Sequence, residues 1–467
     1  MIILFIGRNK ELDTLNKAYL SDRFEFVVLY GRRRVGKTAL LSEFVKDKDA
    51  IYFTGVETTY KQNLSNLSNA IYTFETGMMG SGGIYSTFQA ALSRVFQLAR
   101  DRRIALIIDE YPYVAKAAPE LASTLQMLID KNKDSTNLML VLCGSSMSYM
   151  EDEVLAYKSP LYGRRTAQIH LQAFDFFEVC DYFSDFSDID KANLYGIFGG
   201  TPQYLTQVDR SKSVSENILN TYLNPMSFMF EEPVNLLKQE LREPTIYNAI
   251  ISAIANGCTQ MNVISNLTGE STSTCSAYIK NLISLGIVEK ETPYSSAYKR
   301  KSLYRIEDNM FRFWFRFVQP NLSLITRGIA DEVLKTIEVE LSSYMGFVFE
   351  DICKQYLWRL RRNGECPVSF ADIGRWWGTD KKSKSQVEID IVAKSRSEYL
   401  IGECKWRNEL TQFSDLKKLM EKVVVFDNPM AHFYLFSKSG FTKGCIDFAK
   451  NYEHIHLVTY KDICKLI

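Results

Sequence analysis

The chain has 467 residues, of which 46% are hydrophobic and 24% are charged, and its formal net charge is +1. This length exceeds what one compact core usually spans and suggests about three domains, at roughly 150 residues each. The composition excludes an intrinsically disordered or membrane-embedded class, and the balanced charge means that any nucleic-acid surface must be local.

The cysteines and the first residues indicate the compartment. Nine cysteines show no repeated C-x-x-C spacing and no pairing with histidines. This argues against a zinc site or a disulfide framework and favours a reducing compartment, which we expect to be the cytoplasm. The opening MIILFI lacks the basic start and the cleavage site of a signal peptide, so we expect a strand or a docking segment there. No run approaches the roughly 18 apolar residues of a membrane helix, and we expect no membrane partner.

The strongest motif follows a strand-like run at residues 26–30, where GRRRVGKT matches G-x-x-x-x-G-K-[ST] and leads into an amphipathic helix pattern. In this context the glycines let the backbone wrap around phosphates, the lysine reaches the terminal phosphates, and the threonine ligates Mg²⁺ at the helix N-terminus. The predicted nucleotide contacts of this segment are Gly31, Arg34, Gly36, Lys37, Thr38 and Ala39.

Two acidic residues follow a buried-strand pattern about 70 residues after this loop. Asp109 is predicted to hold Mg²⁺ through water, and Glu110 to orient or deprotonate the attacking water. A third strand pattern, at 137–146, ends in hydroxyl side chains. These hydroxyls either sense the γ-phosphate or cap a helix.

Several segments together resemble a known family: FIGRNKELDTL, GRRRVGKT, LIIDEYPYV, VLCGSS, LYGRRT and GGTPQYL are similar to the archaeal-type, AAA-like ATPases of the signal-transducing (STAND) P-loop class. The resemblance implies that Gly7 and Arg8 pack near the nucleotide base. It also implies that Arg164 or Arg165 reaches the γ-phosphate, and that Pro202 contacts the base from a helical lid. From the residues alone, the arginines are equally a solvated pair, and Gly-Gly-Thr-Pro is a plain turn signal.

Residues 245–310 have the pattern of three helices followed by a β-hairpin, which predicts a winged helix. Five basic residues and one acid between positions 290 and 305 would let the hairpin lie against nucleic-acid phosphates. Winged helices also serve as protein-docking lids in this ATPase class, and both alternatives stay open. The run FRFWFRFV (311–318) is too aromatic for a surface and is expected to seal a joint between domains.

Charged residues recur in EIDIVAKSRSEYLIGECKW (388–406), which has the pattern of two strands joined by a polar turn. Side chains alternate between the faces of a strand, so Glu388 and Asp390 share a face, as do Glu403 and Lys405. Paired as a hairpin, these strands would gather like charges at a cost that a divalent cation removes. We therefore predict that Asp390 and Glu403 bind Mg²⁺, which polarises a phosphodiester, while Lys405 positions the attacking water. The alternative is an exposed hairpin in which Glu403 and Lys405 neutralise each other.

An acid on one strand followed by E-x-K on the next resembles the PD-(D/E)-x-K superfamily of restriction-endonuclease-like proteins, with Ile389 in place of the usual proline. The resemblance implies a helix-borne glutamate at the metal site, and Glu350 in the helix pattern 343–360 fits this role. The alternative for Glu350 is an i,i+4 surface ion pair with Lys354.

Between that helix and the strands, aromatic and basic residues alternate in GRWWGTDKKSKSQ. Trp376 and Trp377, next to Lys381, Lys382 and Lys384, would suit a nucleic-acid strand, although the tryptophans could equally be core residues.

The sequence as a whole predicts an α/β multidomain protein. A P-loop NTPase domain with a parallel sheet is expected over residues 1–170, a helical lid over 171–242, a winged helix over 243–327 and a restriction-endonuclease-like α/β domain over 328–467. ATP and Mg²⁺ are the expected ligands and DNA the expected partner, and self-association is left open. We expect an ATP-gated, Mg²⁺-dependent nuclease whose nucleotide state shifts the lid and winged helix. The rivals are an ATP-dependent switch that binds DNA or protein without cutting, and an ATPase with a purely structural tail.

Overall fold

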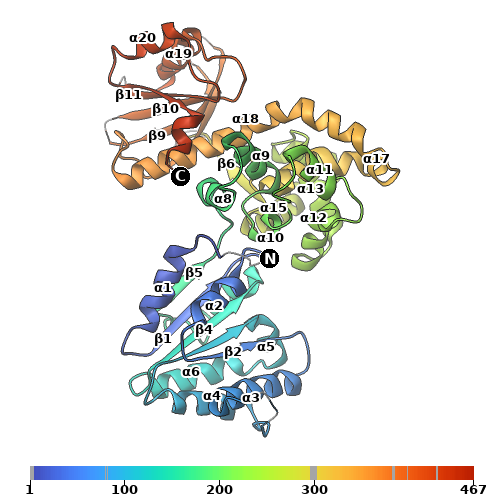
Figure 1. Cartoon of the computed structure of the whole chain (residues 1–467), viewed down its shortest axis with the longest axis vertical. Helices are drawn as coiled ribbons and strands as arrows, with labels where there is room; N and C mark the ends of the chain where they lie inside the picture. Colours follow the sequence, from blue (N-terminus) through green and yellow to red (C-terminus); the bar gives the residue numbers. More distant parts are fainter. Residues whose placement is uncertain are drawn as a thin grey trace. The chain divides into compact units, whose positions relative to one another are not determined.

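The computed structural model describes residues 5–78, 80, 82–294, 302–380, 384–396, 398–426 and 430–466. They form two compact units (Figure 1). The first unit consists of Met1–Ala173 with Thr201–Gln203, and the second of Phe174–Gly200 with Tyr204–Ile467. The four predicted domains therefore fall into two units, and the boundaries of the lid and the winged helix stay predictions.

A parallel sheet of five strands, in the order β2-β3-β4-β1-β5, forms the centre of the first unit. The sheet is formed by β1 (Glu25–Tyr30), β2 (Ala50–Thr54), β3 (Ile104–Asp109), β4 (Leu138–Gly144) and β5 (Ala167–His170). Strands β1, β3 and β4 are buried along their whole length, which fits their continuous runs of apolar residues. The predicted P-loop domain with a parallel sheet is thus found.

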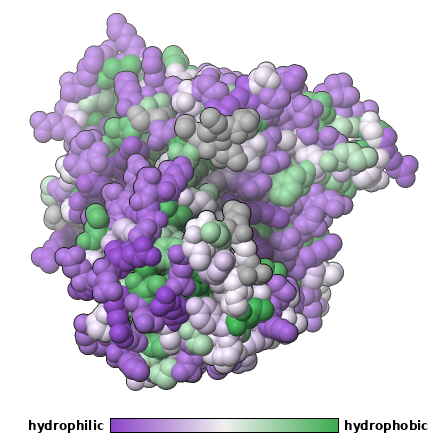
Figure 2. Space-filling view, turned by 60° about the horizontal axis from the view of Figure 1, so that its bottom comes forward, coloured by the Kyte–Doolittle hydropathy of each residue, from purple (hydrophilic) through white to green (hydrophobic). Residues whose placement is uncertain are grey.

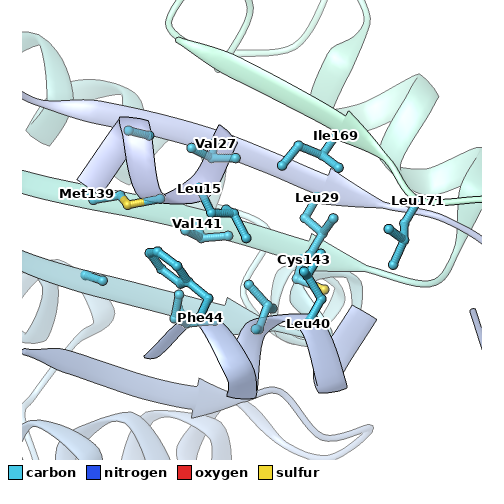
Figure 3. Close-up of a cluster of buried hydrophobic side chains, with 14 of the residues drawn as sticks. Leu15, Val27, Leu29, Leu40, Phe44, Met139, Val141, Cys143, Ile169 and Leu171 are labelled. Atoms are coloured by element: carbon cyan, nitrogen blue, oxygen red, sulfur yellow. The ribbon is translucent and has the colours of Figure 1, made fainter. Parts of the chain in front are cut away.

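Helices of this unit pack against the sheet and fix the loop between β1 and α2. They are α1 (Asn9–Tyr19), α2 (Lys37–Val45), α3 (Tyr60–Thr76), α4 (Phe88–Leu98), α5 (Tyr111–Ala117), α6 (Leu121–Asn132), α7 (Met147–Tyr149) and the π-helical turn η1 (Met150–Leu155). Figure 3 shows Leu40 and Phe44 of α2 packed with Leu29 of β1 and Val141 of β4 in one buried cluster. Phe5, at the end of the apolar opening segment, packs against the same cluster.

The second unit begins with a helical part that includes the residues predicted to form a winged helix. Its first helices are α8 (Phe176–Tyr182), α9 (Asp188–Phe198), α10 (Pro202–Leu205, which starts in the first unit), α11 (Val214–Thr221) and α12 (Phe228–Glu240). Then follow α13 (Pro244–Ala255), α14 (Met261–Thr268), α15 (Thr272–Ser284), β6 (Val288–Glu291) and β7 (Leu303–Ile306). Strands β6 and β7 pair antiparallel, with Glu289 opposite Arg305. The predicted order of three helices and a hairpin is found, but three of the five basic residues, at positions 299–301, lie outside the described residues.

The aromatic run 311–318 is buried apart from its two arginines, and it forms α16 (Asn309–Phe313) and the π-helical turn η3 (Trp314–Val318). The Trp314 indole N–H donates to the carbonyl oxygen of Phe230 in α12 at 2.8 Å. The Phe313 ring contacts the rings of Tyr222 and Tyr344. This run therefore packs between the lid helices and the long helix α18, where a sealing role was expected.

A mixed sheet in the order β12-β11-β10-β9-β8 forms the C-terminal part of the second unit. Its strands are β8 (Ile373–Thr379), β9 (Gln386–Lys394), β10 (Tyr399–Lys405), β11 (Ala431–Ser437) and β12 (Ile455–Thr459). Pairing is antiparallel from β8 to β10 and parallel from β10 to β12. The remaining elements are η4 (Gln319–Asn321), α17 (Leu322–Thr326), α18 (Ala330–Asn363), α19 (Phe413–Glu421), η5 (Lys422–Val425), α20 (Lys443–Ala449) and α21 (Tyr460–Cys464). Helix α18 has 34 residues, and it begins 13 positions before the predicted helix (343 − 330) and leads from the helical part to this sheet (Figure 1).

Within the described part of the chain, no helix is long and apolar enough to cross a bilayer. The face shown in Figure 2 is mostly hydrophilic, with hydrophobic residues in small separate patches.

Candidate functional site

The P-loop runs from Gly31, which follows β1, to Lys37, the first residue of α2. Arg34 and Gly36 have φ angles of 73° and 94°, in the left-handed region, so the loop folds back on itself. A Cβ atom at Gly31 would lie 2.2 Å from the carbonyl oxygen of Leu171, which leaves room for glycine alone. Lys37 Nζ donates to two carbonyl oxygens at the start of the loop, at 2.8 and 3.0 Å. The ammonium group is thereby held inside the loop that cradles phosphates in this motif.

Two predicted Mg²⁺ ligands of the nucleotide site lie together. The Thr38 hydroxyl donates to Asp109 Oδ2 at 3.0 Å, and the Tyr52 hydroxyl donates to the same oxygen at 2.8 Å. Asp109 is 2% exposed. Burial and the charge of Asp109 raise the pKa of Tyr52, so Tyr52 is a neutral donor at physiological pH. A hydroxyl and a buried carboxylate facing each other are oxygen donors of the kind that Mg²⁺ takes, so Thr38 and Asp109 fit this ion.

Glu110 forms a hydrogen bond with a residue that follows the neighbouring strand, β4. It follows β3 in a left-handed conformation, with φ of 51°, and its backbone N–H donates to Asp109 Oδ1 at 3.0 Å. The hydroxyl of the buried Ser145, which follows β4, donates to Glu110 Oε1. Ser146 is the N-cap residue of α7, but its side chain makes no capping hydrogen bond. The hydroxyls after β4 were expected to meet a phosphate or cap a helix, and the structure adds a third role, in which Ser145 orients Glu110.

The segments at the start of the chain and around Pro202 contact the P-loop. Arg8 is buried in a left-handed conformation after Gly7, and its Nη2 donates to the carbonyl oxygens of Val35, at 3.1 Å, and Gln172, at 2.6 Å. From the other segment, Thr201 Oγ1 accepts from an arginine of the P-loop at 3.0 Å. The Pro202 ring lies 3.7 Å from where a Cβ of the second P-loop glycine would be. The structure thus brings the predicted base-side residues against the loop.

Arg164 is bound to a residue that the sequence did not indicate. Its Nη2 lies 2.6 Å from Asp130 Oδ2, and its Nε donates to Asp130 Oδ1 at 2.8 Å. The adjacent Arg165 donates to the carbonyl oxygen of Leu155 at 3.5 Å. A contact to a γ-phosphate would require Arg164 to leave Asp130, and its catalytic role stays a prediction.

A second group of charged side chains lies at one end of the C-terminal sheet. Strands β9 and β10 pair as the predicted hairpin, with Ile391 opposite Gly402, so Asp390 and Glu403 occupy the next positions outward. The Cys404 backbone N–H donates to Asp390 Oδ2 at 2.9 Å. Lys405 Nζ lies 2.7 Å from Glu403 Oε1, so the neutralising pair that was the alternative is formed.

Both oxygens of Glu403 have cationic partners. Lys422, at the start of η5, lies with its Nζ 2.5 Å from Glu403 Oε2. Burial lowers the pKa of Lys405, but the charge and hydrogen bond of Glu403 outweigh it and raise the pKa overall. Lys405 is therefore positively charged at neutral pH.

Helix α18 adds the predicted third carboxyl group. Burial and the nearby Asp390 raise the pKa of Glu350 to about 7, and burial and Glu403 raise the pKa of Asp390 to about 6. The Glu350–Lys354 surface pair was the wrong alternative. Lys354 instead lies 3.8 Å from Asp351, three residues earlier on the same helix, and 3.8 Å from a glutamate of β6.

These carboxyl groups partly fit a divalent cation. Glu350 Oε2 is buried without a hydrogen-bond partner, and the raised pKa values of Glu350 and Asp390 show that their negative charge is poorly compensated. Within the described ranges, no three His, Cys, Asp or Glu side chains form a ready-made ligand group for a metal ion. Since Mg²⁺ typically takes one or two carboxylates and keeps several waters, Asp390 and Glu350 supply a sufficient protein donor set.

One neighbouring prediction needs correction, and one open alternative is decided. Glu388 was placed on the same patch, but it is 56% exposed and pairs with Arg375 of β8, because its position at the outer end of β9 faces solvent. Trp376 is a core residue, packed with Ile389 and Phe426. Of the lysines proposed next to it, those at 381 and 382 lie outside the described residues.

Sequence reasoning missed several residues of these sites. They are Tyr52, Ser145, Arg375 and Lys422. Arg375 alternates with apolar and aromatic neighbours in its strand, which was a usable signal. Lys422 is the first residue of an otherwise apolar turn, and no sequence pattern indicated a role for it.

Two families match this chain. Residues 5–208 match a family described as an ATPase domain predominantly from Archaea. Residues 314–419 match a family described as Archaea bacterial proteins of unknown function. The first match covers the P-loop and every predicted nucleotide contact. The second covers Glu350, Asp390, Glu403 and Lys405 and assigns them no activity.

Individual proteins are similar to this chain over different lengths. The chain is 34% identical over 420 residues to the uncharacterized protein MJECL04 of Methanocaldococcus jannaschii, which covers 89% of this chain and 90% of the relative. A stretch of 47 residues is 40% identical to the uncharacterized ATP-binding protein MJ0423 of the same organism, covering 10% of this chain and 80% of that protein. Among solved structures, the Walker-type ATPase PABY2304 of Pyrococcus abyssi is similar with a TM-score of 0.52 and 17% identity, covering 67% of this chain and 96% of that one. At this identity the similarity concerns the fold alone.

Proposed function

This chain belongs to a family of proteins that join an ATPase domain, found predominantly in Archaea, to a C-terminal part of unknown function, and we propose that this C-terminal part is a Mg²⁺-dependent nuclease acting on DNA. The first unit is a P-loop ATPase domain that binds ATP. In the proposed function, ATP binding or hydrolysis there controls phosphodiester cleavage by the second unit.

In the ATPase domain, the proposed roles follow from the contacts. Lys37 exchanges its two carbonyl partners for the terminal phosphates of ATP. Thr38 and Asp109 hold Mg²⁺, while Tyr52 fixes the carboxylate of Asp109. Glu110, oriented by the Ser145 hydroxyl, accepts a proton from the attacking water.

One observation carries the nuclease proposal: Asp390, Glu350 and Glu403 gather at one end of the sheet, next to the cationic Lys405. Two of these carboxyl groups are held where burial and mutual repulsion disfavour their ionised form, which a structural ion pair would not require. Asp390 and Glu350 would hold the ion, and Glu403 would join them on leaving its two lysine partners. A bound Mg²⁺ would polarise the phosphodiester and acidify a water. Lys405 would position that water and offset charge on the scissile phosphate.

Cleavage assays test this proposal directly. Plasmid and linear DNA are incubated with the full chain and Mg²⁺ or Mn²⁺, with and without ATP. Cleavage is expected from the wild type and should disappear in Asp390→Asn and Lys405→Ala. Asp447→Asn is the matched control, because Asp447 forms only an exposed pair with Lys450 in the same part of the chain. Cleavage that persists in Asp390→Asn would exclude this site.

A second candidate is an ATP-dependent switch whose second unit binds DNA or protein without cutting. The observation that favours it is that Lys405 and Lys422 occupy both oxygens of Glu403. In that case the charges are structural, and ATP hydrolysis persists while no substrate is cut. Lys37→Ala then abolishes ATP hydrolysis and any nucleotide effect on partner binding, and Asp390→Asn changes neither.

A further inference from the structure

Arg375 links the winged-helix hairpin to the proposed metal site. From β8, its Nη1 lies 3.3 Å from Glu291 Oε2 of β6, and its Nε lies 3.6 Å from Glu350 Oε2 of α18. Its Nη2 also pairs with Glu388 of β9. The Arg375 side chain is only 14% exposed, so three carboxylates from three elements share one largely buried guanidinium.

The contact with Glu350 is the weakest of these three. Arg375 Nε and Glu350 Oε2 are both buried, and neither has a hydrogen-bond partner. At 3.6 Å the two groups attract by charge without forming a hydrogen bond. Arg375 therefore partly compensates the charge of Glu350, in the position where a metal ion would compensate it fully.

On its other side, Arg375 is held by a network of ion pairs. Glu291 also lies 3.3 Å from Arg305 Nε and 3.8 Å from Lys354 Nζ. Arg305, in β7, pairs in turn with Glu289 of the hairpin and Asp351 of α18. The position of the hairpin strands therefore sets how strongly Glu291 attracts Arg375.

The network borders a cavity that gives Arg375 room to move. A cavity of about 850 Å³ is lined by Arg375, Glu291, Arg305 and Lys354, together with the aromatic rings of Tyr294 and Tyr399. A side chain facing such a space can exchange partners without repacking a core.

We propose that Arg375 is a positioning residue that gates metal binding at Glu350, and that the winged-helix hairpin sets this gate through Glu291. The inference rests on the metal site of the proposed function. Glu291 and Glu350 compete for one guanidinium. When Glu291 holds Arg375, Glu350 is available to a metal ion. When the hairpin and Glu291 move away, Arg375 turns to Glu350 and excludes the ion.

This competition predicts effects of opposite sign for two neighbouring substitutions. Without Arg375, Glu350 loses a competing positive charge. Arg375→Gln should therefore bind Mn²⁺ at least about tenfold more tightly, which is the effect of one charge roughly 6 Å from a dication even at the dielectric constant of water. Without the Glu291 charge, Arg375 is released to Glu350, and Glu291→Gln should bind Mn²⁺ more weakly than the wild type. Arg316→Gln is the control, because Arg316 forms an exposed pair with Glu340.

The experiment is a Mn²⁺ titration of the full chain by isothermal calorimetry, without nucleotide or DNA. The relevant binding event is the one that Asp390→Asn removes, which separates it from the ion bound by the ATPase domain. Urea unfolding of each variant shows that it is folded under the titration conditions.

The outcomes separate this inference from the proposed function. Tighter binding in Arg375→Gln with weaker binding in Glu291→Gln supports the gate. Binding that depends on Asp390 but is unchanged in Arg375→Gln, or is weakened in both variants, overturns the gate and leaves the nuclease proposal standing. No Asp390-dependent binding in any variant overturns the metal site, and the gate with it.

Discussion

Replacing Asp390 with asparagine should stabilise the metal-free protein while removing metal binding. Burial and Glu403 raise the pKa of Asp390 to about 6, from a usual value near 3.8. A shift of about 2 units corresponds to about 3 kcal/mol at most, at about 1.4 kcal/mol per unit. Because Glu350 shares this repulsion, we expect Asp390→Asn to raise the free energy of unfolding by about 1 to 2 kcal/mol at pH 7.5. The asparagine side-chain oxygen can still accept the hydrogen bond from the Cys404 N–H.

The expected pH dependence follows from the direction of this shift. The folded protein keeps the proton of Asp390 up to about pH 6, whereas the unfolded chain loses it near pH 4. Between these values the folded state binds more protons, so its free energy of unfolding falls as the pH rises. This decrease in the free energy of unfolding is complete above the pKa that Asp390 has in the folded protein. The advantage of Asp390→Asn should therefore be absent near pH 4, grow towards pH 7 and then stay constant.

Urea unfolding in EDTA at pH 5 and pH 7.5, repeated with Mn²⁺, measures both effects. The wild type should gain stability from Mn²⁺ at pH 7.5, and Asp390→Asn should gain less or nothing from the same site. Asp447→Asn serves as the control for loss of a surface carboxylate. The reasoning would be refuted if Asp390→Asn lowered the free energy of unfolding by more than about 1 kcal/mol in EDTA at pH 7.5. Such a decrease is larger than the usual effect of a surface substitution. It would mean that neighbouring groups stabilise the ionised carboxylate, and no unfavourable charge would then call for a metal ion.

Three further predictions concern other parts of the molecule. Gly31→Ala should lower the free energy of unfolding of the first unit by about 2 to 4 kcal/mol and abolish ATP binding, because the added Cβ meets the Leu171 carbonyl oxygen. Gly83→Ala is the control, since a Cβ there has no atom within 4 Å and should change neither property. Urea unfolding and nucleotide titration measure the two effects. Ser145→Ala should lower kcat for ATP hydrolysis about three- to tenfold with little change in ATP affinity, and an equal loss in affinity would argue against a role in orienting Glu110. Asp351→Asn should lower the free energy of unfolding by about 2 to 4 kcal/mol at pH 7, because Arg305 loses a buried partner. Burial disfavours the ionised Asp351, but the Arg305 charge outweighs this effect and lowers the pKa of Asp351. The difference in free energy of unfolding between wild type and Asp351→Asn should therefore persist above about pH 4 and become smaller at lower pH, as measured by urea unfolding.

Local sequence patterns were sufficient for the nucleotide site. Gly31 to Thr38 lie on one strand, loop and helix, so their spacing alone fixes their geometry. Asp109 could also be predicted, because parallel strands place their carboxyl ends at one edge of a sheet. Tyr52 lies on an edge strand whose apolar alternation is compatible with many neighbours, and only the register of β2 against β3 shows that its hydroxyl reaches Asp109.

Ion-pair partners were the least predictable feature. Spacing on a helix offered Lys354 as a partner of Glu350, yet Lys354 lies against Asp351 and Glu291. Asp351 is a neighbour on the same helix, whereas Glu291 is brought to Lys354 by another element. Glu291 is about 60 residues away in sequence, in the hairpin of β6 and β7, and no local pattern could indicate it.

The ion pairs around Glu403 bear on the choice between nuclease and switch. In the metal-free protein, Lys405 and Lys422 both pair with Glu403, whereas the charges of Asp390 and Glu350 are poorly compensated. Under the proposed function, the carboxylates would hold a metal ion and Glu403 would release its two lysines, whose ammonium groups would then attract a phosphate. Metal and DNA should therefore bind more tightly together than separately. A switch with a purely structural lysine–glutamate pair would show no such cooperativity, because its lysines would stay on Glu403.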